Sequence, residues 1–301
     1  IMDEIRQAFA LSEDAEITME ANPGTVSLEQ MKLCRKASIN RISLGLQSTV
    51  QQELDMLGRI HTYEEFLQSY QWAREAGFDN INVDLMFAIP GQTCESWKHN
   101  LETVAELLPE HISAYSLIIY WETPFARKKL ILPTEDEEYQ MYEDTAEILR
   151  KYGFHQYEIS NYARKGFECR HNKGYWQRTE YLGAGLGAAS LFQGQRFSNT
   201  SDMKVYLSDS TDPEKIREDV TTLSGSNEME EFMFLGLRMT EGISERQFER
   251  NFGCRIEDIY GSVLTKYKDM DLLEHTGEFW RFTRKGIHVS NPVLADFLLD
   301  E

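Results

Sequence analysis

Strand-like and helix-like segments alternate through the first 160 residues, and this alternation restricts the fold more than any other feature of the chain. Strand patterns are expected over residues 17–21, 41–48, 81–87, 111–119 and 156–161. Helical patterns lie between them, over residues 27–36, 62–77, 93–108 and 134–153. Strands separated by helices of this length pair in parallel through right-handed crossovers. We therefore expect an α/β fold, either a doubly wound sheet or a (β/α) barrel.

The first three strands carry apolar and polar residues in alternation, which places the two kinds on opposite faces of the sheet. The polar set consists of Thr18, Glu20, Asn22, Ser43, Gly45, Gln47, Asn82 and Asp84. Helices must cover the apolar face, so the polar face either holds a ligand or meets solvent. We favour a ligand, because unpaired carboxylates are costly to bury and parallel sheets rarely leave one face to solvent.

Three of these polar residues, Glu20, Gln47 and Asp84, lie late in their strands. Parallel α/β folds bind ligands near the carboxyl ends of their strands. Two carboxylates and an amide suit hydroxyl groups and an ammonium group, such as those of a ribose joined to an amino acid. They do not suit a phosphate, and no glycine-rich phosphate loop follows these strands.

The pattern changes after about residue 162, which divides the chain into three expected parts: 1–162, 163–224 and 225–301. The second part is rich in glycine and aromatic residues without clear periodicity, and we expect a functional loop region there. The third part predicts helices over 228–239, 244–251 and 256–269, followed by a hairpin over 272–282. Helices followed by a hairpin resemble a winged-helix module.

The charge of the chain disfavours nucleic acid as a partner. It has 31 Lys and Arg against 50 Asp and Glu, a formal net charge of −19, and the winged-helix-like part has nine basic against fifteen acidic residues. Such surfaces repel phosphate backbones and anionic lipids. No apolar run reaches the roughly 18 residues of a transmembrane helix, and the four cysteines form no C-x-x-C pair. We expect a cytoplasmic protein with reduced thiols.

Eight motifs follow one another in an order and spacing that resemble a known family. They are E-A-N-P-G-T (20–25), I-S-L-G-L-Q-S (42–48), L-G-R-I-H-T (57–62), I-N-V-D-L-M-F-A-I-P-G-Q-T (81–93), Y-S-L (115–117), Q-Y-E-I-S-N-Y-A-R (156–164), C-R-H-N-K-G-Y-W (169–176) and L-G-A-G-L-G-A-A-S (182–190). The family is that of the radical S-adenosylmethionine (SAM) oxygen-independent coproporphyrinogen III oxidases, and the resemblance is greatest to its haem-chaperone branch. It implies a partial (β/α)6 TIM-type barrel lacking its N-terminal strands here, with a helical, winged-helix-like C-terminal domain.

The resemblance also implies S-adenosylmethionine and a [4Fe-4S] cluster as cofactors. The positions that match the S-adenosylmethionine contacts are Glu20, Gln47, Arg59, Asp84, Ile118 and Ala189. The cluster motif of the family, C-x-x-x-C-x-[YF]-C, does not occur here, and the spacing of the four cysteines fits no cluster loop. We therefore expect the cluster ligands upstream of Ile1, with this chain beginning at about the third strand of the barrel.

Residues 171–176 match the H-N-x-x-Y-W motif of the chaperone branch, which implies haem binding. The matching residues are His171, Asn172, Tyr175 and Trp176. Imidazole is a standard ligand of haem iron, and Tyr and Trp offer flat apolar surfaces to a porphyrin. We therefore predict His171 as the iron ligand, with the Cys169 thiolate as an alternative. Without the motif, a histidine beside aromatic residues is more often a packed loop residue.

The expected function is that of a haem chaperone that binds S-adenosylmethionine and haem and passes haem to an unidentified acceptor protein. The alternative is oxidative decarboxylation of two propionates of coproporphyrinogen III, which gives protoporphyrinogen IX. The sequence leaves open whether the chain is an enzyme, because both activities share the S-adenosylmethionine site. A third reading, an unrelated polar barrel that binds a sugar or nucleoside, explains fewer of the motifs.

Overall fold

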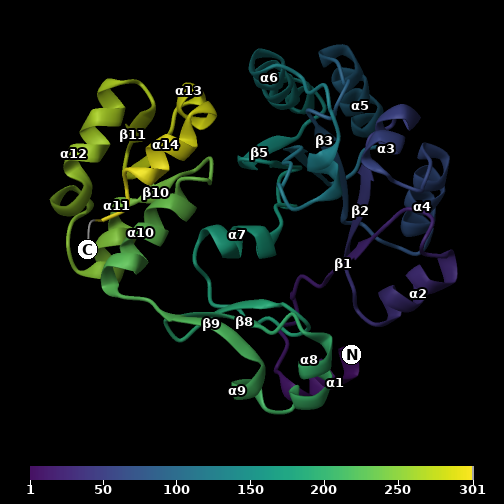
Figure 1. The fold of residues 1–301 in the computed structure, drawn as a ribbon, viewed down its shortest axis with the longest axis horizontal. Coiled ribbons are helices and arrows are strands. Elements are labelled where there is room, and N and C mark those ends of the chain that lie inside the picture. The colour runs from purple at the N-terminus through teal and green to yellow at the C-terminus, as the bar shows by residue number, and fades with distance from the viewer. Residues whose placement is uncertain (300–301) are drawn as a thin grey trace. The chain divides into compact units, whose positions relative to one another are not determined.

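The computed structural model describes residues 1–299 and divides into two compact units, residues 1–168 and the chain from Cys169 onward. Each unit has its own hydrophobic core. Figure 1 shows the helices and strands of both units. The two are described in turn.

The first unit is built on a six-stranded sheet with the order β1-β2-β3-β4-β6-β5. Its parallel strands are β1 (Thr18–Ala21), β2 (Arg41–Gln47), β3 (Ile81–Phe87) and β4 (His111–Ser116). The remaining two, β5 (His155–Glu158) and β6 (Asn161–Ala163), form an antiparallel hairpin, and β6 pairs antiparallel with β4. The prediction of one parallel strand over 156–161 is therefore wrong. The Glu158 side chain accepts hydrogen bonds from the Ser160 N–H and from Asn161, which stabilises a turn at that point.

The helices of the first unit are α1 (Met2–Ala8), α2 (Leu28–Lys36), α3 (Gln51–Leu57), α4 (Tyr63–Glu75), α5 (Cys94–Glu106), the 3₁₀ helix η1 (Pro124–Arg127) and α6 (Glu135–Lys151). Of these, α2 to α6 lie along the outside of the sheet (Figure 1). Capping boxes begin α2, α4 and α6, where a Ser or Thr side chain accepts from the third backbone N–H of the helix. The four helices predicted from the sequence are therefore confirmed, whereas α1 and α3 were not predicted.

Helix α3 has no side-chain cap, and a buried carboxylate anchors it instead. Glu53 is 7% exposed and accepts hydrogen bonds from Ser48 at 2.6 Å, Gln92 at 2.9 Å and Asn100 at 3.1 Å. These donors come from three other segments of the unit. Since no local signal marks this helix, only the tertiary structure explains it.

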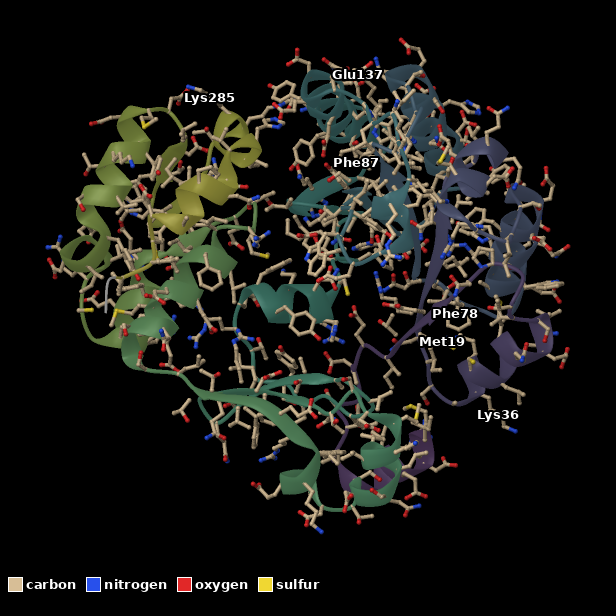
Figure 2. The ribbon with its side chains drawn as sticks, in the orientation of Figure 1. Met19, Lys36, Phe78, Phe87, Glu137 and Lys285 are labelled. Carbon is tan, nitrogen blue, oxygen red and sulfur yellow. The ribbon has the colours of Figure 1, made fainter. Side chains whose placement is uncertain are left out.

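The core of the first unit lies between the apolar face of the sheet and the helices. Phe78 and Phe87, labelled in Figure 2, belong to it. Trp97 of α5 is fully buried, and its indole N–H lies 2.9 Å from both the Met141 carbonyl and the Thr145 hydroxyl of α6. Apolar residues of β2 and β3 point into this core as the alternation predicts, so their polar neighbours occupy the other face.

The second unit contains two small antiparallel sheets. One has the order β7-β8-β9 and comprises β7 (Ala189–Phe192), β8 (Gln195–Asn199) and β9 (Arg217–Thr222). Near it in sequence are the helices α7 (Arg170–Trp176), α8 (Met203–Asp209) and α9 (Pro213–Ile216). The expectation of a loop region over 163–224 is therefore wrong, because α7, α8, α9 and the sheet β7-β8-β9 lie within that stretch.

The rest of the second unit packs helices around the other sheet, ordered β10-β12-β11. Its strands are β10 (Ile243–Ser244), β11 (Leu273–Thr276) and β12 (Phe279–Phe282), and its helices are α10 (Gly225–Gly236), α11 (Glu245–Phe252), α12 (Ile256–Asp269), α13 (Arg284–His288) and α14 (Ser290–Ala295). The predicted hairpin and the three predicted helices are confirmed.

Within residues 1–299, none of the helices is both long enough and apolar enough to span a bilayer.

Candidate functional site

Asp84 of β3 is held by a network of polar side chains on the polar face of the sheet. Ser43 donates to Oδ2 of Asp84 at 3.0 Å, and the Asn82 amide donates to Oδ1 at 2.7 Å. Burial raises the pKa of Asp84, the hydrogen bonds from Asn82, Ser43 and Ser113 oppose that shift, and the negative charge of Glu20 adds to it. The network thus fixes the position of a carboxylate that a cationic or hydroxyl-bearing ligand would stabilise.

His111 of β4 fixes the Asn82 amide from the other side. Its Nδ1 lies 2.6 Å from Asn82 Oδ1, and its Nε2 lies 2.8 Å from the Tyr157 hydroxyl. Because the amide oxygen can only accept, Nδ1 carries the hydrogen and Nε2 accepts from Tyr157. Burial lowers the pKa of His111 well below its usual value, so the ring is neutral as this arrangement requires. The Asn82 NH₂ group is therefore directed toward Asp84.

A second polar group surrounds Gly45, near the carboxyl end of β2. Arg59 Nη2 donates to the Gly45 carbonyl at 2.8 Å and to Asn22 Oδ1 at 3.0 Å. A Cβ atom at position 45 would lie 2.9 Å from Arg59 Nη2 and 3.2 Å from Gln47 Nε2, so glycine permits this close approach. Tyr115 of β4 donates its hydroxyl to Gln47 Oε1 at 2.9 Å, which fixes the amide of Gln47.

The residues around Asp84 and those around Gly45 lie close to the same side chain, Tyr115. Burial raises the pKa of Tyr115 to about 12, the charges of Asp84 and Glu20 contribute to this rise, and Gln47 and Arg59 oppose it. Glu20 itself is exposed on β1. The structure therefore brings together four of the residues predicted to contact S-adenosylmethionine, namely Glu20, Gln47, Arg59 and Asp84.

A cavity of about 410 Å³ opens beside this group. Gln47, Arg59 and Tyr115 form its polar part. Its remaining lining residues are Leu57, Met86, Leu117, Ile118, Ile119, Thr123 and Phe125. A concave, largely apolar surface with a few convergent polar groups is typical of a small-molecule site. Ile118 lies in this wall, 65% exposed, whereas Ala189 is at the start of β7 in the second unit and stays a prediction.

The H-N-K-G-Y-W motif forms α7, and its side chains divide between two faces of that helix. His171 and Tyr175 are one turn apart, and their rings meet edge to face with centroids 4.5 Å apart. Asn172 and Trp176 are also one turn apart, and the Arg238 guanidinium lies 5.4 Å from the centroid of the Trp176 ring. The four predicted haem-binding residues therefore do not share a single face.

The two predicted iron ligands differ in access. His171 is exposed on α7, whereas Cys169, the residue that precedes the helix, is 3% exposed. Iron coordination requires direct contact with the ligand atom, so His171 is the more accessible of the two.

The four cysteines Cys34, Cys94, Cys169 and Cys254 form no disulfide bond. Among the described residues, no three His, Cys, Asp or Glu side chains are grouped in a way that could hold a metal ion. These cysteines therefore do not fit a [4Fe-4S] site, and the function proposed below uses no step through a cluster.

Sequence reasoning missed three residues of the first unit that contribute to the polar network. His111, Ser113 and Tyr115 alternate along β4 with apolar residues, so the rule applied to the first three strands would have found them. The hydroxyl of Tyr157 has no such signal, because it reaches His111 from the hairpin strand β5.

Comparison with known proteins gives matches along nearly the whole chain. The radical SAM superfamily model matches residues 1–104, and that of the HemN C-terminal domain matches residues 223–289. The chain is 39% identical to the haem chaperone HemW of Lactococcus lactis over 95% of this chain and 76% of that protein. It is 36% identical to HemW of Bacillus subtilis over 99% of this chain and 80% of that protein. Among solved structures, coproporphyrinogen III oxidase (HemN) from Escherichia coli, a radical SAM enzyme, superposes with a TM-score of 0.85 at 21% identity, over 99% of this chain and 73% of that chain.

Proposed function

Because the chain belongs to the HemW family of haem chaperones within the radical SAM superfamily, we propose that it binds haem and S-adenosylmethionine at separate sites and delivers haem to an acceptor protein. The superposition on the oxidase confirms the predicted α/β partial-barrel fold with a C-terminal domain. The observation that carries the proposal is the exposed His171–Tyr175 pair on α7, within a motif whose relatives are named for haem.

Haem would bind through the His171 imidazole as an axial ligand. Tyr175 contacts His171 on one side and Tyr181 on the other, with ring centroids 4.7 Å apart in the second pair. These rings supply apolar surface beside the iron ligand, and aromatic contact stabilises a flat porphyrin. An exposed site of this kind suits a carrier, since a haem that must be handed on cannot be enclosed.

S-adenosylmethionine would bind over the polar face of the first unit. The carboxylates of Asp84 and Glu20 suit its ribose hydroxyls and its ammonium group, and Arg59 suits its carboxylate. Gln47, held by Tyr115, would supply an amide for a further hydrogen bond. When bound, S-adenosylmethionine supplies a reactive sulfonium. The residues of this chain bind and orient it.

A haem titration followed at the Soret band tests the haem site. We expect His171→Ala to remove the axial ligand, which would shift the Soret band and weaken haem binding by about tenfold or more. His99→Ala is the matched control, because His99 is an exposed histidine on α5 outside the motif. An unchanged Soret band in His171→Ala would remove His171 from the site.

The decarboxylation alternative needs a separate assay. Protein with a reconstituted cluster would be incubated without oxygen with coproporphyrinogen III, S-adenosylmethionine and a one-electron reductant such as dithionite. We expect no protoporphyrinogen IX, because the relatives that carry the family assignment are named as chaperones rather than oxidases. Stoichiometric formation of that product would replace the chaperone proposal with the catalytic one.

A further inference from the structure

Glu231 of α10 is an almost fully buried carboxylate, 7% exposed, that receives two guanidinium groups. Arg178 Nε donates to its Oε2 at 2.9 Å, and Arg196 Nε donates to its Oε1 at 2.5 Å. Burial alone would raise the pKa of Glu231, but the hydrogen bonds from Arg196 and Arg178 outweigh burial and lower it. The carboxylate is therefore ionised and joins two distant segments to α10.

The first segment is the end of the motif helix. Arg178 lies two residues beyond α7 and has a φ of 56°, in the left-handed region that non-glycine residues rarely occupy. Its N–H donates to the Tyr175 carbonyl at 3.2 Å, which closes the last turn of the helix. The bond from Arg178 to Glu231 helps to hold this strained turn, and with it the C-terminal end of α7.

The second segment is β8, which contains Arg196 and pairs with β7. Leu191 of β7 pairs with Arg196 on one side and with Tyr181 on the other, so the side chains at 181 and 196 project from the same face of the sheet. Arg196 and Tyr181 are therefore neighbours on this face. The Tyr181 ring contacts Tyr175, and Tyr175 contacts His171.

We propose that Glu231 is a positioning residue for haem binding, which sets the orientation of His171 through Arg178, which closes the last turn of α7, and through Tyr175. The side chains of His171 and Tyr175 are exposed, so few packing contacts fix their rings. Their orientation therefore depends on the Arg178–Glu231 ion pair at the end of α7. This inference rests on the proposed function, because it concerns the residues that orient the haem ligand.

Glu231→Gln tests the inference, since it keeps the shape of the side chain and removes its charge. We expect haem binding to weaken by about tenfold, which is within the range for residues coupled to a site through contacts. We also expect the Soret band to shift, because the axial ligand is no longer held in its bonding orientation. Near-UV circular dichroism would report whether the second unit keeps its packing.

Glu228→Gln is the matched control. Glu228 lies one turn earlier on α10 and meets only the outer side of Arg178, at 3.5 Å with its side chain 38% exposed. We expect haem affinity within about twofold of the unmodified chain, as for most exposed ion pairs. Equal haem affinity and equal spectra in Glu231→Gln and Glu228→Gln would overturn the inference.

Arg178→Lys is a milder second variant. It keeps the positive charge beside Glu231 and removes the Nε–H group that bonds Oε2 of that carboxylate. We expect haem binding weaker by about threefold and a Soret shift in the same direction as in Glu231→Gln. If Glu231→Gln fails to fold, an unchanged spectrum in Arg178→Lys overturns the inference. Failure of the unmodified chain to bind haem would instead reject the proposed function.

Discussion

The two candidate sites are built by opposite means. In the first unit the polar residues come from successive strands of one sheet, and Asp84 is fixed by neighbours on β2, β3 and β4. In the second unit the haem motif is a single short helix, α7, and its orientation depends on Arg178 and on Glu231, which lies far along the chain. The site around Asp84 is part of a buried network, whereas the site on α7 is an exposed surface whose orientation depends on the buried Glu231.

This difference has an energetic consequence. A residue of the sheet network cannot be replaced without leaving buried polar partners unsatisfied, so substitutions there destabilise the fold. A residue on the exposed face of α7 can be replaced with little effect on stability, so substitutions there change ligand binding instead. Three substitutions test this distinction, beginning with the one expected to have the largest effect.

Asn82→Leu should destabilise the first unit by about 3 kcal/mol, since each buried polar group left without its partner costs about 1–3 kcal/mol. It leaves Asp84, His111 and Ser113 without their shared partner, and all three lie on the sheet. His171→Leu, on the exposed face of the motif helix, should cost less than about 1 kcal/mol. Urea unfolding followed by circular dichroism measures both values, and equal losses would show that the two sites are not built differently.

The stability of the first unit should fall as the pH is lowered from 6.5 to 5.5. Burial lowers the pKa of His111 well below 6.5 and that of His61 below it, so in this window the unfolded chain takes up protons that the folded chain does not. The free energy of unfolding should fall by about 1 kcal/mol because of His111, and His61 should add a loss in the same direction that is no larger. Their stabilising contribution is present above pH 6.5 and is lost below it.

His111→Gln should remove at least half of that pH-dependent loss and leave the share of His61. His171→Gln, on the exposed face of α7, is the control and should leave the loss unchanged. Urea unfolding at pH 6.5 and 5.5 gives the difference for each variant. A loss of the same size in His111→Gln as in the unmodified chain would show that His111 is not kept neutral by the network.

The polar face of the first unit could be predicted because side-chain alternation along a strand depends only on local backbone geometry. Glu20, Gln47 and Asp84 were found in this way, and Arg59 was found from the family resemblance. Applied to β4, the same rule would also have found His111. What it could not supply is the direction of each hydrogen bond, because that depends on partners from other strands.

The second unit was less predictable for a related reason. Glycine and aromatic residues between 163 and 200 show no period, so α7 and the sheet β7-β8-β9 were missed. The motif predicted haem binding. That His171 and Trp176 lie on different faces is seen only once the motif is known to form a helix. The pairing of Glu231 with Arg178 and Arg196 joins segments that no local pattern connects.

Cys169→Ser should have the smallest effect, and it tests whether the exposed site extends to the start of α7. The thiol precedes the helix and is buried, so a haem iron would reach it only if the first turn of α7 unwound. We expect an unchanged Soret band, haem affinity within about twofold, and a stability change of about 1 kcal/mol or less, because serine has nearly the same volume and favours the position before a helix. A shifted Soret band would make the thiolate a ligand and would mean that α7 rearranges when haem binds. The site of the second unit would then be formed by its ligand, whereas the network around Asp84 is already in place without one.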